Sequence, residues 1–414
     1  MRFVPDGPDI PNLLIKKWRD GEVLFLAGAG VSVPSNLPLF EGLALDVYKN
    51  LGESLFGTLR AARRHTRPSG RAKVLDGATL SPEMRVEANL FFDRQFDRFF
   101  SALEKRIDPD LRGRAKTRNV RAAVEAILSG TGYSESHKDL LRLSLAPSSS
   151  GDRSKPLSCR IATTNFDLLF EAAWQAEFGT EPASFDARMA PRPGAHNFDG
   201  IIHLHGMLTG DPKRPPNYVL SSRDFARVYL RSGVIGNYVY DLIRRYTVVL
   251  VGYSADDPPM RYLMDAIGED ASLFDDMNPP YAITDLGVDL GDPVAAIEEA
   301  VWRNKEITPI FFKRRRGRNQ FTPLWESIHL SADWARDETT WVERQLEENT
   351  RSRRADTSPF QRGFVQDLLS VLNNDELANA IRFLNGRRVD FAWVETVAAA
   401  IEAVKTSAES GSSR

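Results

Sequence analysis

Polar or glycine-rich groups follow three of the buried strands that this sequence predicts. The first is the stretch 28–32, Gly-Ala-Gly-Val-Ser, directly after the apolar run Val23–Ala27. A glycine turn after a strand can present backbone N–H groups to a phosphate, because no Cβ shields them. Asn165 and Asp167 follow the second strand, and His205 ends the third. Ligands of open α/β sheets bind where the strands end, so we expect these groups to converge on one crevice.

Each of these groups has a simpler explanation when it is taken alone. Asn165 and Asp167 are two residues apart in a turn, where local hydrogen bonds could account for both. A third glycine of a G-x-G-x-x-G fingerprint would fall at Val33, and no acidic residue follows at the usual distance. A polar pair and a strand-end histidine beside one glycine turn nevertheless favour a ligand site.

Several other chemistries are disfavoured by the residues present. His203 and His205 would share one face of a strand, but the chain has six histidines and no third ligand at a recognisable spacing. The segment around Ser32 lacks the second glycine of a serine-hydrolase elbow, and no Gly-Lys-Ser/Thr ends the turn as in a P-loop. Cys159 is the only cysteine, which excludes an intrachain disulfide, and its apolar neighbours predict a buried thiol.

Composition indicates a soluble globular protein of more than one domain. The chain has 414 residues, 42% hydrophobic and 27% charged, with a net charge of −2. This charge gives no global attraction to nucleic acid or to anionic membranes. The N-terminus has no apolar signal region, and no apolar run approaches the length of a transmembrane helix. We therefore expect a cytoplasmic location.

The elements that must position the polar groups alternate between strands and helices. This alternation predicts an α/β fold with a doubly wound parallel sheet covered on both faces. Helices are predicted at 9–20, 42–52, 168–178 and 259–267. The predicted strands are 23–27, 159–164, 200–206, 247–254, 281–285 and 307–312.

A mostly helical insert is expected from about residue 45 to about residue 155, between the first two sheet strands. Ser81-Pro82 starts one helix, which is expected to carry the core stripe Phe92, Phe96, Phe99 and Leu103. Further helices are predicted at 119–128 and 137–145. The basic stretch 59–73 is interpreted as an exposed loop, and 147–156 as a Ser-rich turn.

The character of the chain changes after Lys313. Residues 314–318 form a basic linker, and the remainder is predicted to be helical with a frayed Ser-rich end at 407–414. We therefore expect a site-bearing domain over 1–312, which includes the insert, and a C-terminal helical domain over 313–414.

Four short motifs follow one another over about residues 22–290. They are Gly28-Ala29-Gly30-Val31-Ser32 with Leu37-Pro38-Leu39-Phe40, then Thr164-Asn165-Phe166-Asp167, His205-Gly206 and Gly252-Tyr253-Ser254. In this order they resemble the motifs of the sirtuin family, which are G-A-G-x-S with I-P-x-F-R, Q-N-x-D, H-G and G-T-S. The resemblance implies a Rossmann-like, NAD-binding domain that cleaves the bond between nicotinamide and ribose.

The departures from the family pattern refine this expectation. One cysteine cannot build the four-cysteine zinc ribbon of sirtuin deacylases, Glu41 replaces the arginine after Phe40, and Thr164 replaces glutamine. The chain thus resembles the zinc-free bacterial sirtuin-like group of NAD hydrolases that act in defence against phage. Some members of that group are paired with a HerA-type hexameric ATPase and carry an appended helical domain. NAD as substrate, no zinc and a homo-oligomer are the implied features.

The resemblance also implies roles for individual residues. His205 would be the general base, and Asn165 would orient the attacking water or the hydroxyls of the nicotinamide ribose. Asp167 would fix the loop that carries it. The residues expected to contact NAD are Gly28, Ala29, Gly30 and Val31 at the diphosphate with Ser32 and Thr164 as donors, Phe40 over the nicotinamide ribose, Gly252 and Ser254 at the adenosine half, and Asp285 at its ribose.

Two other functions stay open on the sequence. A non-catalytic module could sense NAD or ADP-ribose, although binding alone would require neither Asn165 nor His205. A DNA-associated effector or nuclease, acting with an ATPase partner, could use the basic stretches 59–73 and 314–318. Protein deacylation is disfavoured because the zinc ligands are missing.

Overall fold

The computed structural model describes most of the chain. The described residues are 1–65, 67–108, 118–130, 132–146, 158–195, 197–209, 217–254, 258–273, 279–288, 292–317, 319–387 and 389–400. The expected turn at 147–156 and the expected frayed end at 407–414 lie outside these ranges.

Seven strands of the described residues run parallel in the order β4-β5-β3-β1-β6-β7-β8. They are β1 (Val23–Ala27), β3 (Ser158–Thr163), β4 (Ser184–Asp186), β5 (Gly200–His203), β6 (Thr247–Val251), β7 (Tyr281–Leu286) and β8 (Thr308–Lys313). The short β2 (Leu145–Ala146) pairs antiparallel with β3. The predicted α/β class and all six predicted strands are confirmed.

The strand order places a switch point in the middle of the sheet. From β1 the chain adds β3 and β5 on one side, and then returns to add β6, β7 and β8 on the other. This is the order of a Rossmann fold with β4 as an additional outer strand. In such sheets the crevice between the first strand and the strand that starts the second half receives the ligand, and here those strands are β1 and β6.

Both faces of the sheet are covered, and successive residues of β1 alternate between them. Val23, Phe25 and Ala27 pack against one group of helices, and Leu24 and Leu26 against the other. The first group is α1 (Asn12–Arg19), α8 (Glu135–Ser144), α9 (Leu169–Phe178) and α14 (Thr322–Arg336). The second group is α11 (Val234–Arg245), α12 (Pro258–Leu273) and α13 (Pro293–Arg303).

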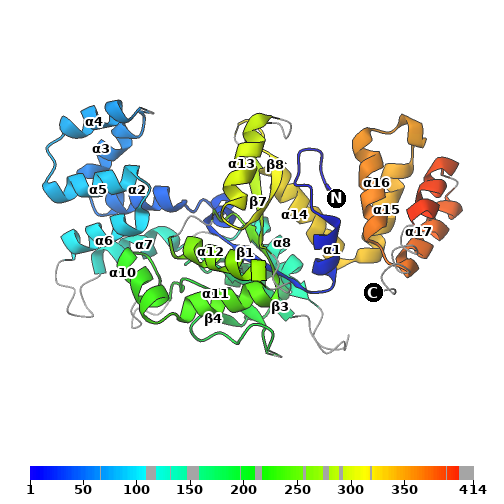
Figure 1. Cartoon of the computed structure of the whole chain (residues 1–414), viewed down its shortest axis with the longest axis horizontal. Coiled ribbons are helices and arrows are strands. Elements are labelled where there is room, and N and C mark those ends of the chain that lie inside the picture. Colours follow the sequence, from blue (N-terminus) through cyan, green and yellow to red (C-terminus); the bar gives the residue numbers. More distant parts are fainter. Residues whose placement is uncertain are drawn as a thin grey trace.

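The helical insert lies at one end of the molecule (Figure 1). Its helices are α2 (Phe40–Asn50), α3 (Leu55–Ala62), α4 (Pro68–Asp76), α5 (Pro82–Phe92), α6 (Phe96–Ile107) and α7 (Arg118–Leu128). They enclose most of a second hydrophobic core, in which Phe99 and Leu103 are fully buried. The insert shares this core with Phe166 and Tyr218, residues that belong to the sheet domain.

Two expectations for the insert are wrong. The stretch 59–73 is not a loop, because Leu55, Leu59 and Ala62 of α3 are buried at helical spacing and Pro68 begins α4. The aromatic stripe spans two helices, α5 and α6, rather than one. The chain breaks between them at Arg94, whose positive φ of 58° cannot continue a helix.

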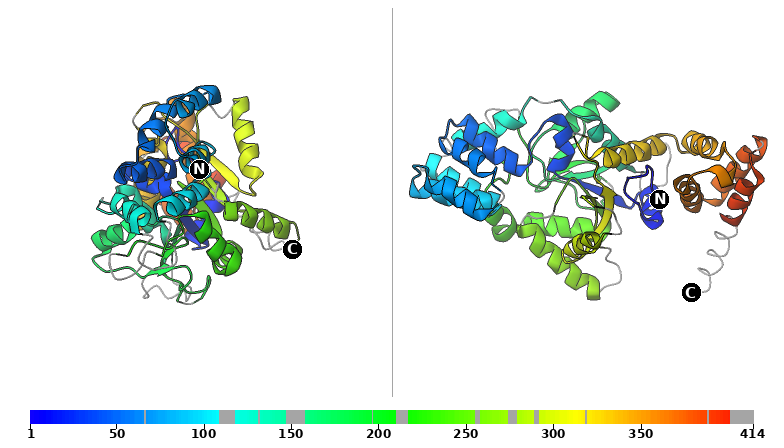
Figure 2. Two further views of the ribbon diagram at one scale, coloured as in Figure 1. Left: turned by 90° about the vertical axis from the view of Figure 1, so that its left-hand side faces the viewer. Right: turned by 90° about the horizontal axis from the view of Figure 1, so that it is seen from above.

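The C-terminal helices lie at the opposite end from the insert (Figures 1 and 2). They include α15 (Glu338–Thr350), the 3₁₀ turn η3 (Arg354–Asp356), α16 (Pro359–Val371) and α17 (Asn374–Gly386). Met1 and Phe3 complete their core, and Arg19 of α1 donates to the carbonyl of Val371. The expected boundary at residue 313 falls before α14, which itself packs on the sheet.

None of the described helices has the length and apolar character needed to cross a bilayer.

Candidate functional site

The loops that follow β1 and β6 meet at the switch point of the sheet. Gly28 N–H donates to the carbonyl of Val251 and Gly30 N–H to that of Gly252, both at 2.9 Å. A Cβ on Gly28 or on Gly30 would lie 2.6 or 2.7 Å from backbone atoms of Gly252. Gly252 itself has a φ of +63°, which favours glycine. Glycine is therefore required on both loops for their close contact.

This contact corrects one expectation about the glycine turn. Its N–H groups were expected to face a ligand, but those of Gly28 and Gly30 donate to the β6 loop. Val31 N–H donates to the carbonyl of Gly28 at 3.0 Å, as the chain enters the 3₁₀ helix η1 (Ala29–Ser35). The turn serves first to join β1 to β6.

The side chain of Ser32 joins the ends of β1 and β3, which were expected to converge, although Ser32 itself was expected to donate to NAD. Its hydroxyl donates to Asp167 Oδ2 at 3.1 Å and accepts from Asn165 Nδ2 at 3.1 Å. Asn165 Nδ2 also lies 3.3 Å from the carbonyl of Gly28. Burial raises the pKa of Asp167, although hydrogen bonds from Ser32 and from the N–H of Leu169 favour its charged form. Ser32, Asn165 and Asp167 are all buried.

His137 of α8 completes this cluster, although it was not among the site residues expected from the sequence. Its Nε2 lies 3.3 Å from Ser32 Oγ, while the N–H of Ser134 points to its Nδ1 at 3.3 Å. Since a backbone N–H can only donate, Nδ1 accepts and the neutral ring carries its proton on Nε2. Burial lowers the pKa of His137 to about 4. The only local signal is its place three residues after Ser134, where it closes a capping box.

The buried His203 forms an ion pair with the partly exposed Glu171 beneath the Asn165 loop. Its Nδ1 donates to the backbone carbonyl of Asn165 at 2.9 Å and its Nε2 to Oε1 of Glu171 at 2.8 Å. Both partners are acceptors, so the ring is an imidazolium. Burial acts to lower the pKa of His203, but the Glu171 carboxylate raises it above its ordinary value. Burial acts to raise the pKa of Glu171, but the charge of His203 holds this pKa below its usual range.

His205 lies beyond the end of β5 and faces different neighbours. Its Nε2 lies 2.8 Å from the hydroxyl of Tyr229, and its ring meets Phe225 edge-on at 5.4 Å. These two aromatic residues come from α10 (Ser222–Phe225) and the π-helical segment that follows it, Ala226–Arg231. The expectation that His203 and His205 share a face is wrong, because β5 ends at His203 and the chain turns there. No sequence signal pointed to Tyr229.

Three other expected ligand contacts have protein partners in this structure. The ring of Phe40 packs against Phe100 of the insert at 5.7 Å. Asp285 pairs with Arg314 at 3.3 Å. The carbonyl of Ser254 accepts from Lys305 Nζ at 3.0 Å. Their roles with a ligand stay predictions.

Two residues at which the sequence departs from the sirtuin motifs also have local partners. Thr164 N–H donates to the carbonyl of Ala27 at 3.1 Å, which continues the pairing of β3 with β1. Glu41 forms an ion pair with Arg63 at 2.7 Å.

Cys159 is buried, as predicted, and burial raises the pKa of its thiol to about 12.

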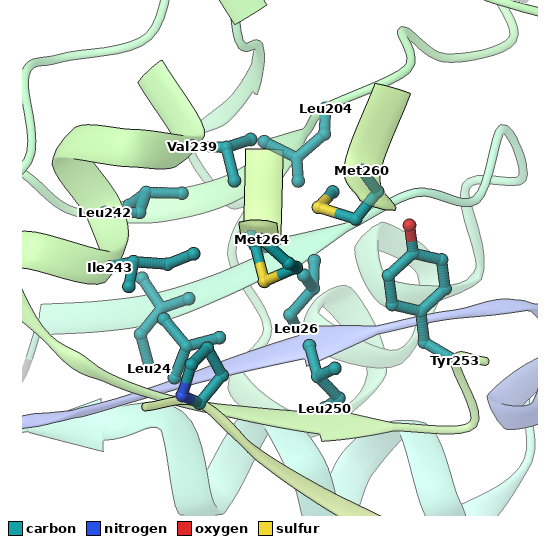
Figure 3. Close-up of a pocket in the computed structure, with 13 residues that line it drawn as sticks. Leu24, Leu26, Leu204, Val239, Leu242, Ile243, Leu250, Tyr253, Met260 and Met264 are labelled. Atoms are coloured by element: carbon teal, nitrogen blue, oxygen red, sulfur yellow. The ribbon is translucent and has the colours of Figure 1, made fainter. Parts of the chain in front are cut away.

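An apolar cavity of ≈ 10 Å³ lies between the sheet and helices α11 and α12 (Figure 3). Leu26, Leu250, Met260 and Met264 line it, and Tyr253 stands at its edge. Its volume suits about one water molecule, and its walls offer that water no polar partners. It is a packing void of the core rather than a ligand site.

Comparisons with known proteins agree with part of this picture. Residues 160–310 match the family described as the SIR2-like domain, so the three later motifs lie within the match and the glycine turn lies before it. The uncharacterised protein y4cA of Sinorhizobium fredii is 32% identical over 336 residues, which are 79% of this chain and 24% of that protein. The chain thus spans about a quarter of that relative's length.

Two solved structures are similar at low levels. The crystal structure of a SIR2 homologue–NAD complex is 15% identical, with 81% of this chain and 97% of that chain covered and a TM-score of 0.31. A Sir2 homologue mutant in complex with ADP-ribose is 15% identical, with 79% and 97% covered and a TM-score of 0.30.

Proposed function

We propose that this protein hydrolyses NAD at the bond between nicotinamide and ribose, which yields nicotinamide and ADP-ribose. One observation carries the proposal: Ser32, Asn165 and Asp167 form a buried hydrogen-bonded cluster at the carboxyl edge of the sheet, and His205 follows the next strand. The match of residues 160–310 to the SIR2-like domain and the order of the four motifs support it.

The substrate would lie across the ends of β1 and β6. Its diphosphate would rest on the turn formed by Gly28, Ala29, Gly30 and Val31, and its adenosine half on the segment 252–254. Glycine at positions 28 and 30 would let the diphosphate approach the backbone closely, although the N–H groups of Gly28, Gly30 and Val31 already donate within the protein. Two ring or charge contacts would have to change on binding: Phe40 would leave Phe100, and Asp285 would exchange Arg314 for a ribose hydroxyl.

The chemistry would follow that of glycoside hydrolysis. The bond from the anomeric carbon to the pyridinium nitrogen breaks, and nicotinamide leaves as a neutral molecule through an oxocarbenium-like state. Water then bonds to the anomeric carbon, and His205 accepts the proton that the water loses. Asn165 would orient this water or the ribose hydroxyls. Tyr229 already holds the His205 ring through Nε2, which fixes its direction.

The test is release of nicotinamide from NAD by the purified full chain, measured by chromatography. His205→Ala and Asn165→Ala are expected to lower the rate by about 10²- to 10⁴-fold. His65→Ala, an exposed histidine of the insert, is the matched control and should match the wild type. Equal NAD loss by the two site variants would contradict the catalytic assignment.

Two measurements separate this function from its rivals. Calorimetric binding of NAD that is recovered intact after long incubation would indicate a sensor rather than a hydrolase. Binding of DNA that weakens steeply with salt would indicate a nucleic-acid effector, because such binding depends on phosphate contacts.

On the resemblance, we also propose that NAD depletion by this protein serves defence against phage, in a homo-oligomer and with a HerA-type ATPase. Cells that express the wild type should lose NAD after infection, whereas cells with His205→Ala should not. Light scattering of the protein, alone and mixed with a HerA-type ATPase, would measure the oligomer and the complex.

A further inference from the structure

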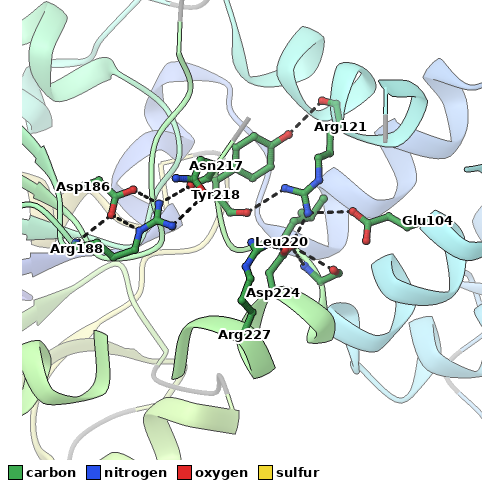
Figure 4. A network of polar contacts seen from close by, with 10 residues as sticks. Glu104, Arg121, Asp186, Arg188, Asn217, Tyr218, Leu220, Asp224 and Arg227 are labelled. Carbon is green, nitrogen blue, oxygen red and sulfur yellow. Dashed lines mark hydrogen bonds and ion pairs between the residues drawn. The ribbon is translucent and has the colours of Figure 1, made fainter. Parts of the chain in front are cut away.

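We infer that Arg121, a residue of the helical insert, is a positioning residue that holds the backbone around Asn165, Asp167 and His205 in place. The inference rests on the proposed function for its catalytic consequence. Arg121 touches none of these three side chains, and it acts through one buried charge cluster between the insert and the sheet domain (Figure 4).

The cluster is buried, and charged groups dominate it. The Arg121 guanidinium donates to the carbonyl of Tyr218 at 3.0 Å and to the carboxylate of Asp224, and it lies 3.1 Å from that of Glu104. The three charged side chains are less than a tenth exposed. A planar guanidinium presents five N–H donors in a fixed fork to the carbonyl and the two carboxylates, whereas a lysine ammonium has three donors on a single nitrogen. Glu104 and Arg121 come from the insert, whereas Asp224 belongs to α10.

The first connection runs through stacked rings to the Asn165 loop. The guanidinium carbon of Arg121 lies 5.1 Å from the centre of the Tyr218 ring, and Tyr218 stacks on Phe166 at 4.8 Å. Phe166 is the residue between Asn165 and Asp167. Movement of Tyr218 would therefore shift the backbone that carries both polar side chains.

The second connection reaches His205 through the backbone. Val219, next to Tyr218, donates its N–H to the carbonyl of His205 at 2.8 Å. A Cβ on Gly206 would lie 2.2 Å from the carbonyl oxygen of Asn217, so this segment passes directly against the His205 turn. The bond from Arg121 to the Tyr218 carbonyl fixes the residue between these two contacts.

The third connection runs through Asp224. Asp224 Oδ2 accepts from Arg121 and also from the N–H groups of Leu220 and Ser221, both at 3.2 Å. These last two bonds cap the N-terminus of α10. That helix continues into the π-helical segment whose Tyr229 contacts His205 Nε2. The segment that carries Tyr229, and so orients His205, is thus bound to the insert through the ion pair between Asp224 and Arg121.

A second charge cluster, partly buried and contained within the insert, provides the control. Arg106 binds Glu87 at 2.8 Å and Glu53 at 3.0 Å, and Glu87 also contacts Tyr48. All four residues belong to the insert or the loops within it. Loss of Arg106 should weaken the insert much as loss of Arg121 does, without a direct connection to the site.

The experiment compares Arg121→Met and Arg106→Met in the full chain, with Arg121→Lys as the conservative variant. We expect kcat for NAD cleavage to fall about a hundredfold in Arg121→Met, because a displacement near 1 Å of reacting groups has that effect. Arg106→Met should lower the Tm but keep kcat within about twofold, and Arg121→Lys should recover part of kcat. Equal losses of kcat in Arg121→Met and Arg106→Met would overturn the inference.

Hydrogen–deuterium exchange gives a readout that does not depend on NAD cleavage. In Arg121→Met the segments 200–208 and 217–225 should exchange faster than in the wild type, while in Arg106→Met they should not. If the wild type leaves NAD intact, the proposed function fails and this comparison still decides the positioning role. Unchanged exchange in Arg121→Met would contradict it.

A milder variant covers the case in which Arg121→Met does not fold. Tyr218→Leu keeps the buried charges and removes the Tyr218 ring, with its stacking on Phe166, its contact with the Arg121 guanidinium and its hydroxyl bond to the Arg121 carbonyl. It should accelerate hydrogen–deuterium exchange in residues 164–168. It should also lower kcat by a larger factor than it changes KM. No change in either quantity would overturn the first connection.

Discussion

The two halves of the sheet's carboxyl edge are built differently. At the ends of β1, β3 and β5, the polar side chains Ser32, Asn165, Asp167 and His203 are buried and hydrogen-bonded to one another or to backbone. At the end of β6 the edge consists of the contact between Gly252 and the glycine turn after β1. Near the end of β7 it consists of the partly exposed ion pair between Asp285 and Arg314.

This difference indicates a division of labour. Groups that take part in bond breaking benefit from fixed geometry and exclusion of water, which the β1–β3–β5 half provides. An exposed ion pair is worth little and can be exchanged for a ligand at small cost, which suits the half expected to bind adenosine. Changes on the first half should therefore affect stability and chemistry strongly, and changes on the second half weakly.

The largest expected effect is at the ion pair between the buried His203 and Glu171 in the first half. Glu171→Gln leaves the His203 imidazolium without its counter-charge and should lower the free energy of unfolding by about 3–5 kcal/mol, measured by urea denaturation at pH 6. In the wild type this stabilisation is complete below the unfolded pKa of histidine and is lost as the pH rises through the raised pKa of His203. If the variant and the wild type had the same urea midpoint, the proposed division of labour between the two halves of the sheet edge would be contradicted.

The second effect concerns His137, whose pKa of about 4 lies below its unfolded value. Between pH 6.5 and 4 the unfolded chain binds a proton that the native state does not. The free energy of unfolding therefore decreases by up to about 3 kcal/mol as the pH is lowered over this range. His137→Gln keeps an acceptor for Ser134 and a donor for Ser32 but cannot titrate. Its urea midpoint should depend less on pH over this range, and an unchanged pH dependence would exclude His137 as the cause.

The third effect is at the junction of the two halves. Gly252→Ala places a Cβ 2.7 Å from Val31 N at a φ of +63°, which should cost about 1–3 kcal/mol and open the contact between the loops. Weaker NAD binding by calorimetry should accompany the loss. Gly57→Ala is the control, because Gly57 lies inside α3 with no atom within 4 Å of the added Cβ, and it should be neutral or stabilising.

The smallest effect is expected on the second half. Asp285→Asn removes an exposed ion pair with Arg314 and should change the free energy of unfolding by less than about 1 kcal/mol. KM for NAD should rise, since the ribose hydroxyl loses a charged acceptor, while kcat stays unchanged. A loss of stability as large as that of Glu171→Gln would show that the two halves are not different.

The strands and the turns after them could be predicted because their signals are local. The apolar run Val23–Ala27 forms β1 with the predicted bounds, and Gly179 ends α9 in the left-handed conformation. The insert was harder to predict. The basic side chains of 59–73 conceal the buried spacing of Leu55, Leu59 and Ala62, and the break at Arg94 has no glycine or proline to mark it.

The sequence by itself determined which polar groups stand at strand ends, since burial of an apolar run and a following turn are properties of neighbouring residues. The tertiary structure decided what each group does. His203 and His205 are two residues apart, yet one is an imidazolium bound to Glu171 and the other faces Tyr229. Their partners come from distant segments that packing brings together, as with Arg121 and Asp224, and no local pattern encodes such pairs.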